Sequence, residues 1–266
     1  MQKLKIALKR VLPDSLFALV RKVYIKTIGR FVDKKNNTLV DGYTKTYLEK
    51  HGYIVSDGPF KGLQYVKESV GSSFLHKLAG YYEAVLIPYV EEVKHLPIQH
   101  ILDIGAAEGY YTTGFGSIFP HASITAFEME EKGRENIKTL HSINHLTNTI
   151  EILGEATSEN VFKYVKPGTL LICDCEGAEK TIFSTPREEA GNIIYGIIEL
   201  HDELVPGCKE AVINFFSPTH TVEVVRFAHA EPKNFVFFKN IPSSDVSVLL
   251  RERGIQDQEW AIIRLK

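Results

Sequence analysis

Cysteine is scarce in this chain, which has three among its 266 residues: Cys173, Cys175 and Cys208. Three thiols make no disulfide framework. The single residue between Cys173 and Cys175 fits neither a zinc knuckle nor a C-x-x-C redox pair. This cysteine usage predicts a reducing compartment, and hence a cytoplasmic protein.

An excess of charge of one sign is also missing from the chain as a whole. The net charge at pH 7 is −2 and the pI is about 6.6, so no overall field favours a nucleic-acid partner. The ten histidines show no pairing at metal spacing. Neither a Ser-His-Asp set nor a G-x-S-x-G elbow is found, which argues against serine hydrolase chemistry.

Positive charge is nevertheless concentrated in residues 1–35, which hold ten Lys or Arg against two Asp. That segment therefore carries +8, and the rest of the chain about −10. Its longest apolar run, residues 16–20, is too short to span a bilayer. The spacing predicts two amphipathic helices broken near Pro13. They pack on the domain or on a second subunit of a homo-oligomer, or they anchor the protein to the anionic inner face of a membrane.

From residue 99 onward, apolar segments of strand length alternate with segments of helical spacing. This alternation predicts a seven-stranded, mostly parallel sheet with helices on both faces, an α/β fold of the Rossmann-like kind. Seven or eight strands are predicted, at 100–104, 123–127, 149–153, 169–173 and 193–199, with later candidates at 221–227, 235–238 and 261–265. Helices are predicted at 110–119, 131–145, 158–165 and 177–183. Because the last strands lack regular helical crossovers, an antiparallel edge is expected.

Three segments follow from this pattern. Residues 1–57 form a basic helical extension, 58–98 a region that covers the site, and 99–266 the main domain. Within the first two, a helix and turn are predicted at 38–58, and a helix that Pro88 kinks or starts at 82–93.

The most informative stretch is Ile-Leu-Asp-Ile-Gly-Ala-Ala-Glu-Gly at residues 101–109. It reads as a buried strand, a tight turn and the start of a helix, and the glycines let backbone N–H groups approach a ligand. The spacing is neither that of dinucleotide folds nor that of phosphate loops. It fits S-adenosylmethionine best. Asp103 either orients the turn or contacts the methionine part, and Gly105, Ala106 and Gly109 let the backbone approach that part. Glu108 is a further candidate for cofactor binding.

Acids stand at the ends of the next predicted strands, where ligands of open α/β sheets bind. Glu128 lies 23 residues beyond Gly105, near the spacing at which an acid accepts hydrogen bonds from ribose hydroxyls. Glu155 is predicted to lie by the adenine amino group. Tyr110 and Tyr111 either lie over the cofactor or pack within the helix.

The acceptor side of the predicted site holds Asp174 and Glu176 after the fourth strand and Glu199 and His201 after the fifth. Asp174, Glu176 and His201 are the candidate catalytic residues, and Asp174 also contacts the cofactor. Asp174, Glu199 and His201 together offer oxygen and imidazole ligands that suit Mg²⁺ or Mn²⁺. Alternatively, these side chains bind the methionine part or cap helices. His220 either joins the site or is a core histidine.

The chain resembles the FkbM-like family of class I S-adenosylmethionine-dependent methyltransferases. The resemblance rests on residues 103–112, 126–128, 174–179 (Asp-Cys-Glu-Gly-Ala-Glu) and 198–201, and extends more weakly over 58–266. It implies the class I methyltransferase fold and O-methylation of a hydroxyl on a sugar, a glycan or a secondary metabolite, as in polysaccharide biosynthesis. One departure is Ile172, where family members carry a lysine.

Three other functions are alternatives to O-methyl transfer. An NAD-type oxidoreductase is disfavoured because a third glycine is missing. A nucleic-acid methyltransferase is disfavoured because the catalytic half is acidic and lacks an Asn-Pro-Pro-Tyr-type motif. A non-catalytic S-adenosylmethionine-binding or scaffold protein in a glycan-assembly complex is the main alternative. The crowded ionisable groups at the acceptor side favour the enzyme.

Overall fold

The computed structural model describes residues 30–67, 73–251 and 258–266, and the side chains from residue 36 onward. The chain divides into two compact units, residues 1–50 and 51–266. The described part of the first unit is α3 (Arg30–His51), longer than the helix expected within 38–58. Residues 1–29 lie outside the described part, so the basic amphipathic helices and their membrane or subunit contact stay a prediction.

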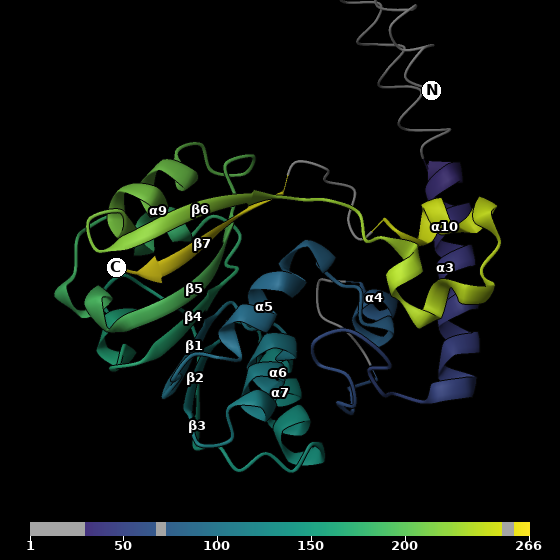
Figure 1. Ribbon diagram of the computed structural model, residues 1–266, viewed down its shortest axis with the longest axis horizontal. Coiled ribbons are helices and arrows are strands. Elements are labelled where there is room, and N and C mark those ends of the chain that lie inside the picture. The colour runs from purple at the N-terminus through teal and green to yellow at the C-terminus, as the bar shows by residue number, and fades with distance from the viewer. Residues whose placement is uncertain (1–29, 68–72, 252–257) are drawn as a thin grey trace, which may run out of the picture. The chain divides into compact units, whose positions relative to one another are not determined.

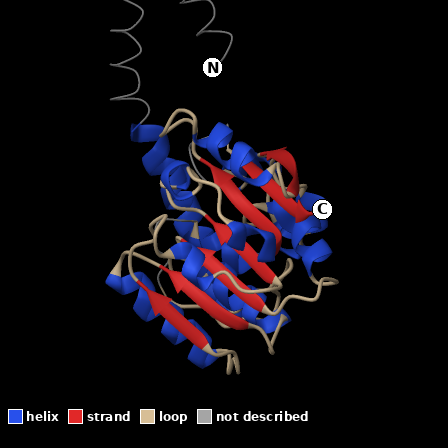
Figure 2. Cartoon of the chain, turned by 90° about the vertical axis from the view of Figure 1, so that its left-hand side faces the viewer, coloured by secondary structure: helices blue, strands red, loops and turns tan. Residues whose placement is uncertain are grey.

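The second unit is built on one seven-stranded sheet with the order β3-β2-β1-β4-β5-β7-β6. The first five strands are parallel, and β7 lies antiparallel between β5 and β6 (Figures 1 and 2). The strands are β1 (His100–Ile104), β2 (Ser123–Phe127), β3 (Ile150–Leu153), β4 (Thr169–Cys173), β5 (Ile193–Leu200), β6 (His220–Arg226) and β7 (Glu259–Leu265). The predicted sheet with its antiparallel edge is confirmed.

Helices cover both faces of the sheet, as the alternation of segments predicts (Figure 1). In this unit they are α4 (Phe74–Ala79), α5 (Ile87–Val93), α6 (Tyr110–Ile118), α7 (Glu131–Ile143), α8 (Glu179–Ile182), α9 (Cys208–Phe216) and α10 (Ser243–Leu249). Pro88 occupies the first turn of α5, where its missing N–H has no helical partner to lose.

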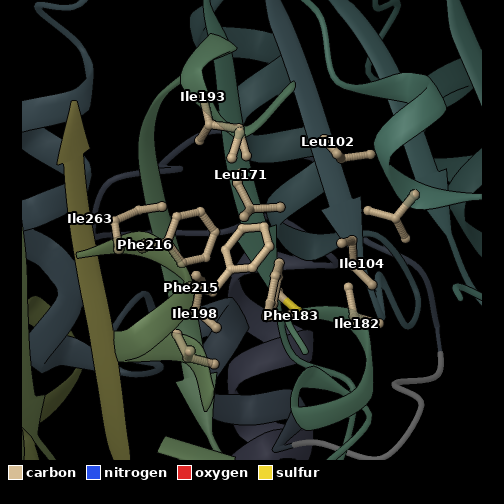
Figure 3. Packing of buried hydrophobic residues seen from close by; sticks show 14 of the residues in the cluster. Leu102, Ile104, Leu171, Ile182, Phe183, Ile193, Ile198, Phe215, Phe216 and Ile263 are labelled. Atoms are coloured by element: carbon tan, nitrogen blue, oxygen red, sulfur yellow. The ribbon is translucent and has the colours of Figure 1, made fainter. Parts of the chain in front are cut away.

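One hydrophobic core lies between the sheet and helices α8 and α9. Alternate residues of a strand point to opposite faces, so Leu102 and Ile104 of β1 enter this core, whereas Asp103 faces the other way. Phe215 and Phe216 of α9 pack edge to face at 4.7 Å between ring centroids. Figure 3 shows these side chains beside Leu171, Ile198 and Ile263, which belong to strands β4, β5 and β7. The α7 side holds a smaller cluster of Ala106, Ala126 and Ile137.

The helix predicted at residues 158–165 is wrong, because only Val161–Tyr164 forms a short 3-10 helix. The Asn160 side chain accepts a hydrogen bond from the Thr157 N–H at 2.8 Å and donates one to the Glu155 carbonyl at 2.9 Å. Side-chain bonds of this kind offer the backbone an alternative to the helix.

The strand predicted at residues 235–238 is also wrong, because Val236–Asn240 is a 3-10 helix. A three-residue period places Phe235 and Phe238 on the same side. Both rings pack against Tyr81, at 5.9 and 4.9 Å between centroids. The Tyr81 hydroxyl donates to the Leu249 carbonyl at 3.0 Å, which joins residues 73–86 to the segment before β7. Among the described residues, none of the helices combines the length and apolarity needed to cross a membrane.

Candidate functional site

A cavity of about 430 Å³ opens at the carboxyl ends of β1, β2, β3 and β4. Its floor is the turn after β1, and its walls come from the segments after the other strands. Most of the acids predicted for the site line it, namely Asp103, Glu128, Glu155, Asp174 and Glu176. Lys77 and Tyr82 of the region before the sheet complete the lining. The cavity thus lies where ligands of open α/β sheets bind.

The turn after β1 takes its shape from left-handed backbone at Gly105, Ala107 and Gly109, with φ values of 80°, 48° and 97°. The amides of Gly105 and Ala106 donate to the Phe127 carbonyl at 2.9 and 3.0 Å. A Cβ at position 105 would lie 1.7 Å from the Asp174 carbonyl oxygen. Glycine is therefore required because two strand ends meet there, and not only for approach to a ligand.

Glu128 is held by two backbone amides at the end of β2. One carboxylate oxygen accepts from the Ala107 N–H at 2.7 Å, and the other from the Glu130 N–H at 2.8 Å. A Cβ on Gly133 would lie 2.6 Å from the Glu128 Cγ, so glycine there leaves room for this side chain. Each oxygen keeps a lone pair for a ligand, as a pair of ribose hydroxyls requires.

Asp103 is 2 % exposed and lines the cavity from the end of β1. Its Oδ2 accepts from the Thr112 hydroxyl at 2.5 Å. Burial raises the pKa of Asp103, the hydrogen bond from Thr112 lowers it, and the negative charges of Asp174 and Glu128 raise it, so that the resulting pKa is about 7. A cationic ligand group beside this carboxyl would favour its ionised form.

Glu108 does not line the cavity, although the sequence placed it among the cofactor ligands. It is fully buried, and its Oε1 accepts from the Tyr65 hydroxyl and from Lys77 Nζ, both at 2.7 Å. Lys77 lies over the Tyr82 and Tyr110 rings, 4.8 and 5.4 Å from their centroids. Glu108 thereby holds a buried ammonium group at the cavity wall.

The turn between β4 and α8 is organised by Glu179, which is fully buried. Its two oxygens accept from the Cys175 and Gly177 amides, each at 2.8 Å. Its Oε1 also contacts His201 Nδ1 at 3.0 Å. The helix is shorter than the predicted 177–183 because these bonds keep residues 175–177 in a turn, with Glu176 at a φ of 53°.

His201 follows β5 and is 2 % exposed. Its Nε2 makes no hydrogen bond within the described part of the chain but lies 3.5 Å from Asp174 Oδ1, 3.7 Å from Glu199 Oε1 and 3.8 Å from Glu176 Oε2. Burial lowers the pKa of His201, but the bond and charge of Glu179, with the charges of Glu199 and Asp174, outweigh it and raise the pKa to about 9. At neutral pH the ring is therefore a cation among carboxylates.

The remaining predicted residues fall into two groups. Ala106, Tyr110 and Tyr111 line the cavity, and Gly109 sets the start of α6. His220 is not part of the site, because its Nε2 lies 2.7 Å from the Ile193 carbonyl at the opposite end of β5. Ile172 lines the cavity, so the wall is apolar where FkbM-like proteins carry a lysine.

Three residues that organise the site have no role predicted from the sequence. Glu179 belongs to the Asp-Cys-Glu-Gly-Ala-Glu block, and an acid at the start of a helix is a signal for amide contacts that could have identified it. Lys77 gives no such signal, since its partner Glu108 is 31 residues away. Gln258 is similarly hidden, and its Nε2 donates to Glu199 Oε1 at 2.9 Å.

Comparison with family models gives no match, and comparison with curated protein sequences gives none either. Solved structures with similar folds include precorrin-6y C5,15-methyltransferase from Geobacter metallireducens GS-15 (13 % identity, 77 % of this chain and 94 % of that chain, TM-score 0.47). Another is the human methyltransferase 10 domain containing protein (13 % identity, 85 % of this chain and 95 % of that chain, TM-score 0.46). A third is the O-methyltransferase from Bacillus cereus in complex with SAH (12 % identity, 68 % of this chain and 79 % of that chain, TM-score 0.43).

The fold assignment stands on the strand order itself. Five parallel strands, with β7 inserted antiparallel between β5 and β6, form the Rossmann-like sheet of class I methyltransferases that the sequence predicts. The FkbM-like resemblance within that class stays a prediction.

Proposed function

We propose that the protein is an S-adenosylmethionine-dependent O-methyltransferase. The reaction breaks the bond between the sulfonium sulfur and its methyl group and forms a bond from that methyl to an acceptor hydroxyl oxygen. The hydroxyl proton leaves, and S-adenosylhomocysteine and a methyl ether result. The observation that carries the proposal is one cavity that holds both the Glu128 carboxylate, oriented by two backbone amides, and the ionisable groups around Asp174.

The nucleoside half of the cofactor fits the β2 and β3 side of the cavity. Glu128 is oriented by two amides and keeps acceptor capacity for the two ribose hydroxyls. Glu155 is exposed at the rim beside Gly154, where it would accept from the adenine amino group. The cavity volume falls within the range of about 300–1,000 Å³ typical of small-molecule sites.

The methionine half fits between Asp103 and Lys77. Its ammonium group is a cation for the buried Asp103 carboxyl, and its carboxylate is an anion for the Lys77 ammonium. Both protein groups are almost fully buried, so such pairs would be only weakly screened by salt. Lys77 thereby gains a role that no sequence motif suggested.

The acceptor half of the proposal rests on Asp174 and Glu176. Asp174 touches the cavity on one side and faces His201 on the other. Because the His201 ring already carries a proton at neutral pH in the metal-free protein, Asp174 is the group we assign to hold the acceptor hydroxyl and receive its proton. Carboxylates at the rim accept hydrogen bonds from neutral hydroxyls and repel phosphates, which favours a sugar, glycan or polyhydroxylated metabolite over nucleic acid.

The direct test is calorimetric titration of S-adenosylmethionine and S-adenosylhomocysteine into the full chain, beside Glu128→Ala. We expect binding by the unmodified protein and a loss of about 100-fold in the variant, because two hydrogen bonds to a charged group disappear. The control is Glu131→Ala, an exposed acid at the start of α7, which should bind as tightly as the unmodified protein.

Absence of binding for both ligands would overturn the cofactor assignment. Where the cofactor binds, transfer of a labelled methyl group to a panel of sugars and glycans comes next. Product with a hydroxyl acceptor supports O-methyl transfer. Binding without transfer to any acceptor would favour the scaffold alternative.

A second prediction concerns pH. The pKa of Asp103 lies near 7 in the free protein, so its carboxyl gains charge as pH rises from 6 to 7.5. Cofactor affinity should rise over that interval, since the ionised carboxyl is the form that pairs with an ammonium group. In Asp103→Asn the affinity should be lower and lose this rise. A rise of equal size in both proteins would place the titrating group elsewhere.

The contribution of Asp103 to the stability of the folded protein should change with pH in the opposite direction from its contribution to cofactor affinity. The pKa of Asp103 is raised on folding, so the native state holds this proton more tightly than the unfolded chain does. Its contribution to stability is fully present below the unfolded pKa, near 4, and is lost as pH rises towards 7. Urea denaturation of the cofactor-free protein between pH 5 and 7 measures this loss, which Asp103→Asn should remove.

A further inference from the structure

We propose that His201, Asp174 and Glu199 bind one divalent cation, Mg²⁺ or Mn²⁺, at the acceptor edge of the cavity. The catalytic use of this ion rests on the proposed methyl transfer, but its binding does not. Two independent observations support it: a deeply buried imidazole nitrogen without a hydrogen bond, and a ring of carboxylates facing that nitrogen.

The distances around His201 Nε2 suit ligands of one ion better than hydrogen bonds. The three facing oxygens lie 3.5, 3.7 and 3.8 Å away, beyond the usual donor–acceptor range. Ligand atoms about 2.1 Å from a common ion are about 3.0 Å apart at a right angle and about 3.6 Å apart at 120°. A small movement would close Asp174 onto an ion bound to Nε2, since the ligand atoms of Asp174 and His201 already lie within 4.8 Å of each other. Glu199 must move further to join them.

The other ring nitrogen is arranged as in metal-binding histidines. Nδ1 lies 3.0 Å from Glu179 Oε1, and Glu179 is itself fixed by the Cys175 and Gly177 amides. A histidine that ligates a metal usually donates its second N–H to such a carboxylate, which orients the ring. Glu179 is therefore a positioning residue for the site, not a ligand.

The negative charge of the carboxylates around His201 favours the binding of a cation. Four carboxylates, those of Asp174, Glu176, Glu179 and Glu199, lie within 3.8 Å of the nitrogens of one imidazole ring. If all four are ionised, even a protonated ring leaves the cluster negative, and Glu179 and Glu199 are almost fully buried, where like charges are unfavourable. A divalent cation in place of the Nε2 proton neutralises one charge more.

The position of the site determines its use. Asp174 also lines the cofactor cavity, and Glu176 is mostly exposed at the rim, where it can complete the coordination. Three protein ligands leave three positions of an octahedral ion for water and the acceptor. Coordination of the acceptor hydroxyl would fix it beside the sulfonium methyl group and favour its ionised form.

The test is titration of the full chain with Mn²⁺ alone, with free Mn²⁺ counted by electron paramagnetic resonance. We expect one ion per chain, and at least tenfold weaker binding in His201→Gln and in Glu199→Gln. Glu199→Gln keeps its size and its contact with Gln258, so it serves where His201→Gln does not fold. The control is His220→Gln, which alters another buried histidine and should bind Mn²⁺ normally.

No stoichiometric Mn²⁺ binding by the unmodified protein, or equal binding in the folded variants, would overturn the proposal and leave His201 as a purely ionic partner of the acids. Cofactor binding measured without metal is independent of this result. Mn²⁺ binding without cofactor binding would reject the proposed function and keep the metal site. The opposite pattern would reject only the metal site.

Discussion

Glu179→Ala is expected to lower the free energy of unfolding by about 3–5 kcal/mol, the range for removing one partner of a buried ion pair. The change leaves the Cys175 and Gly177 amides without their acceptor and His201 without its nearest carboxylate. The turn that carries Asp174 would lose its support, so the proposed methyl transfer should fall with stability. Urea denaturation followed by the fluorescence of the only tryptophan, the buried Trp260, measures the effect.

Two further variants provide comparisons for the stability of Glu179→Ala. Glu179→Gln keeps the shape and one acceptor oxygen, so its loss of stability should lie between those of alanine and the unmodified protein. Glu188→Ala removes an exposed acid and should change stability by less than about 0.5 kcal/mol. Equal stability of Glu179→Ala and Glu188→Ala would mean that Glu179 does not organise the turn.

Gly105→Ala has the second large expected effect. The new Cβ would lie 1.7 Å from the Asp174 carbonyl oxygen, and the left-handed backbone at this position disfavours any side chain. Strain and overpacking together should destabilise the protein by about 2–5 kcal/mol. Cofactor affinity should fall about 100-fold, because the strand ends that line the cavity must separate.

The matched control for Gly105→Ala is Gly191→Ala. A Cβ there meets no atom within 4 Å, and its backbone is not left-handed. Its stability should stay within about 0.5 kcal/mol of the unmodified protein. Calorimetric binding and urea denaturation of both variants separate a local collision from a general effect of adding a methyl group. A Gly105→Ala protein that binds the cofactor normally would contradict this account.

The sheet could be predicted because its strands have period-two or continuous apolar patterns and clear turn signals. Of the five predicted strand ends that carry acids, the first four line one cavity, since parallel strands bring their carboxyl ends to one edge. The errors fell on short segments. Residues 158–165 and 235–238 are too short for periodicity to outweigh a side-chain hydrogen bond or an aromatic contact.

The site was predictable where a residue's role follows from its place on a strand, and not where it follows from a distant partner. Glu128 and Asp103 stand directly at strand ends, so the sequence located them. Lys77 reaches the cavity through its pairing with Glu108, and Glu199 is oriented by Gln258, 59 residues later. Such long-range pairs leave no local pattern in a single sequence.

The position of β7 in the chain affects how the sheet forms while the protein is being synthesised. β6 pairs only with β7 in the sheet order, and β7 comes later in the chain. During synthesis, β6 therefore lacks its pairing strand until roughly thirty more residues have been added. This takes a few seconds at about 5–20 residues per second. In that interval the open edges of β5 and β6 are both available to other strands. A chaperone that shields this half of the nascent chain would protect it until β7 arrives.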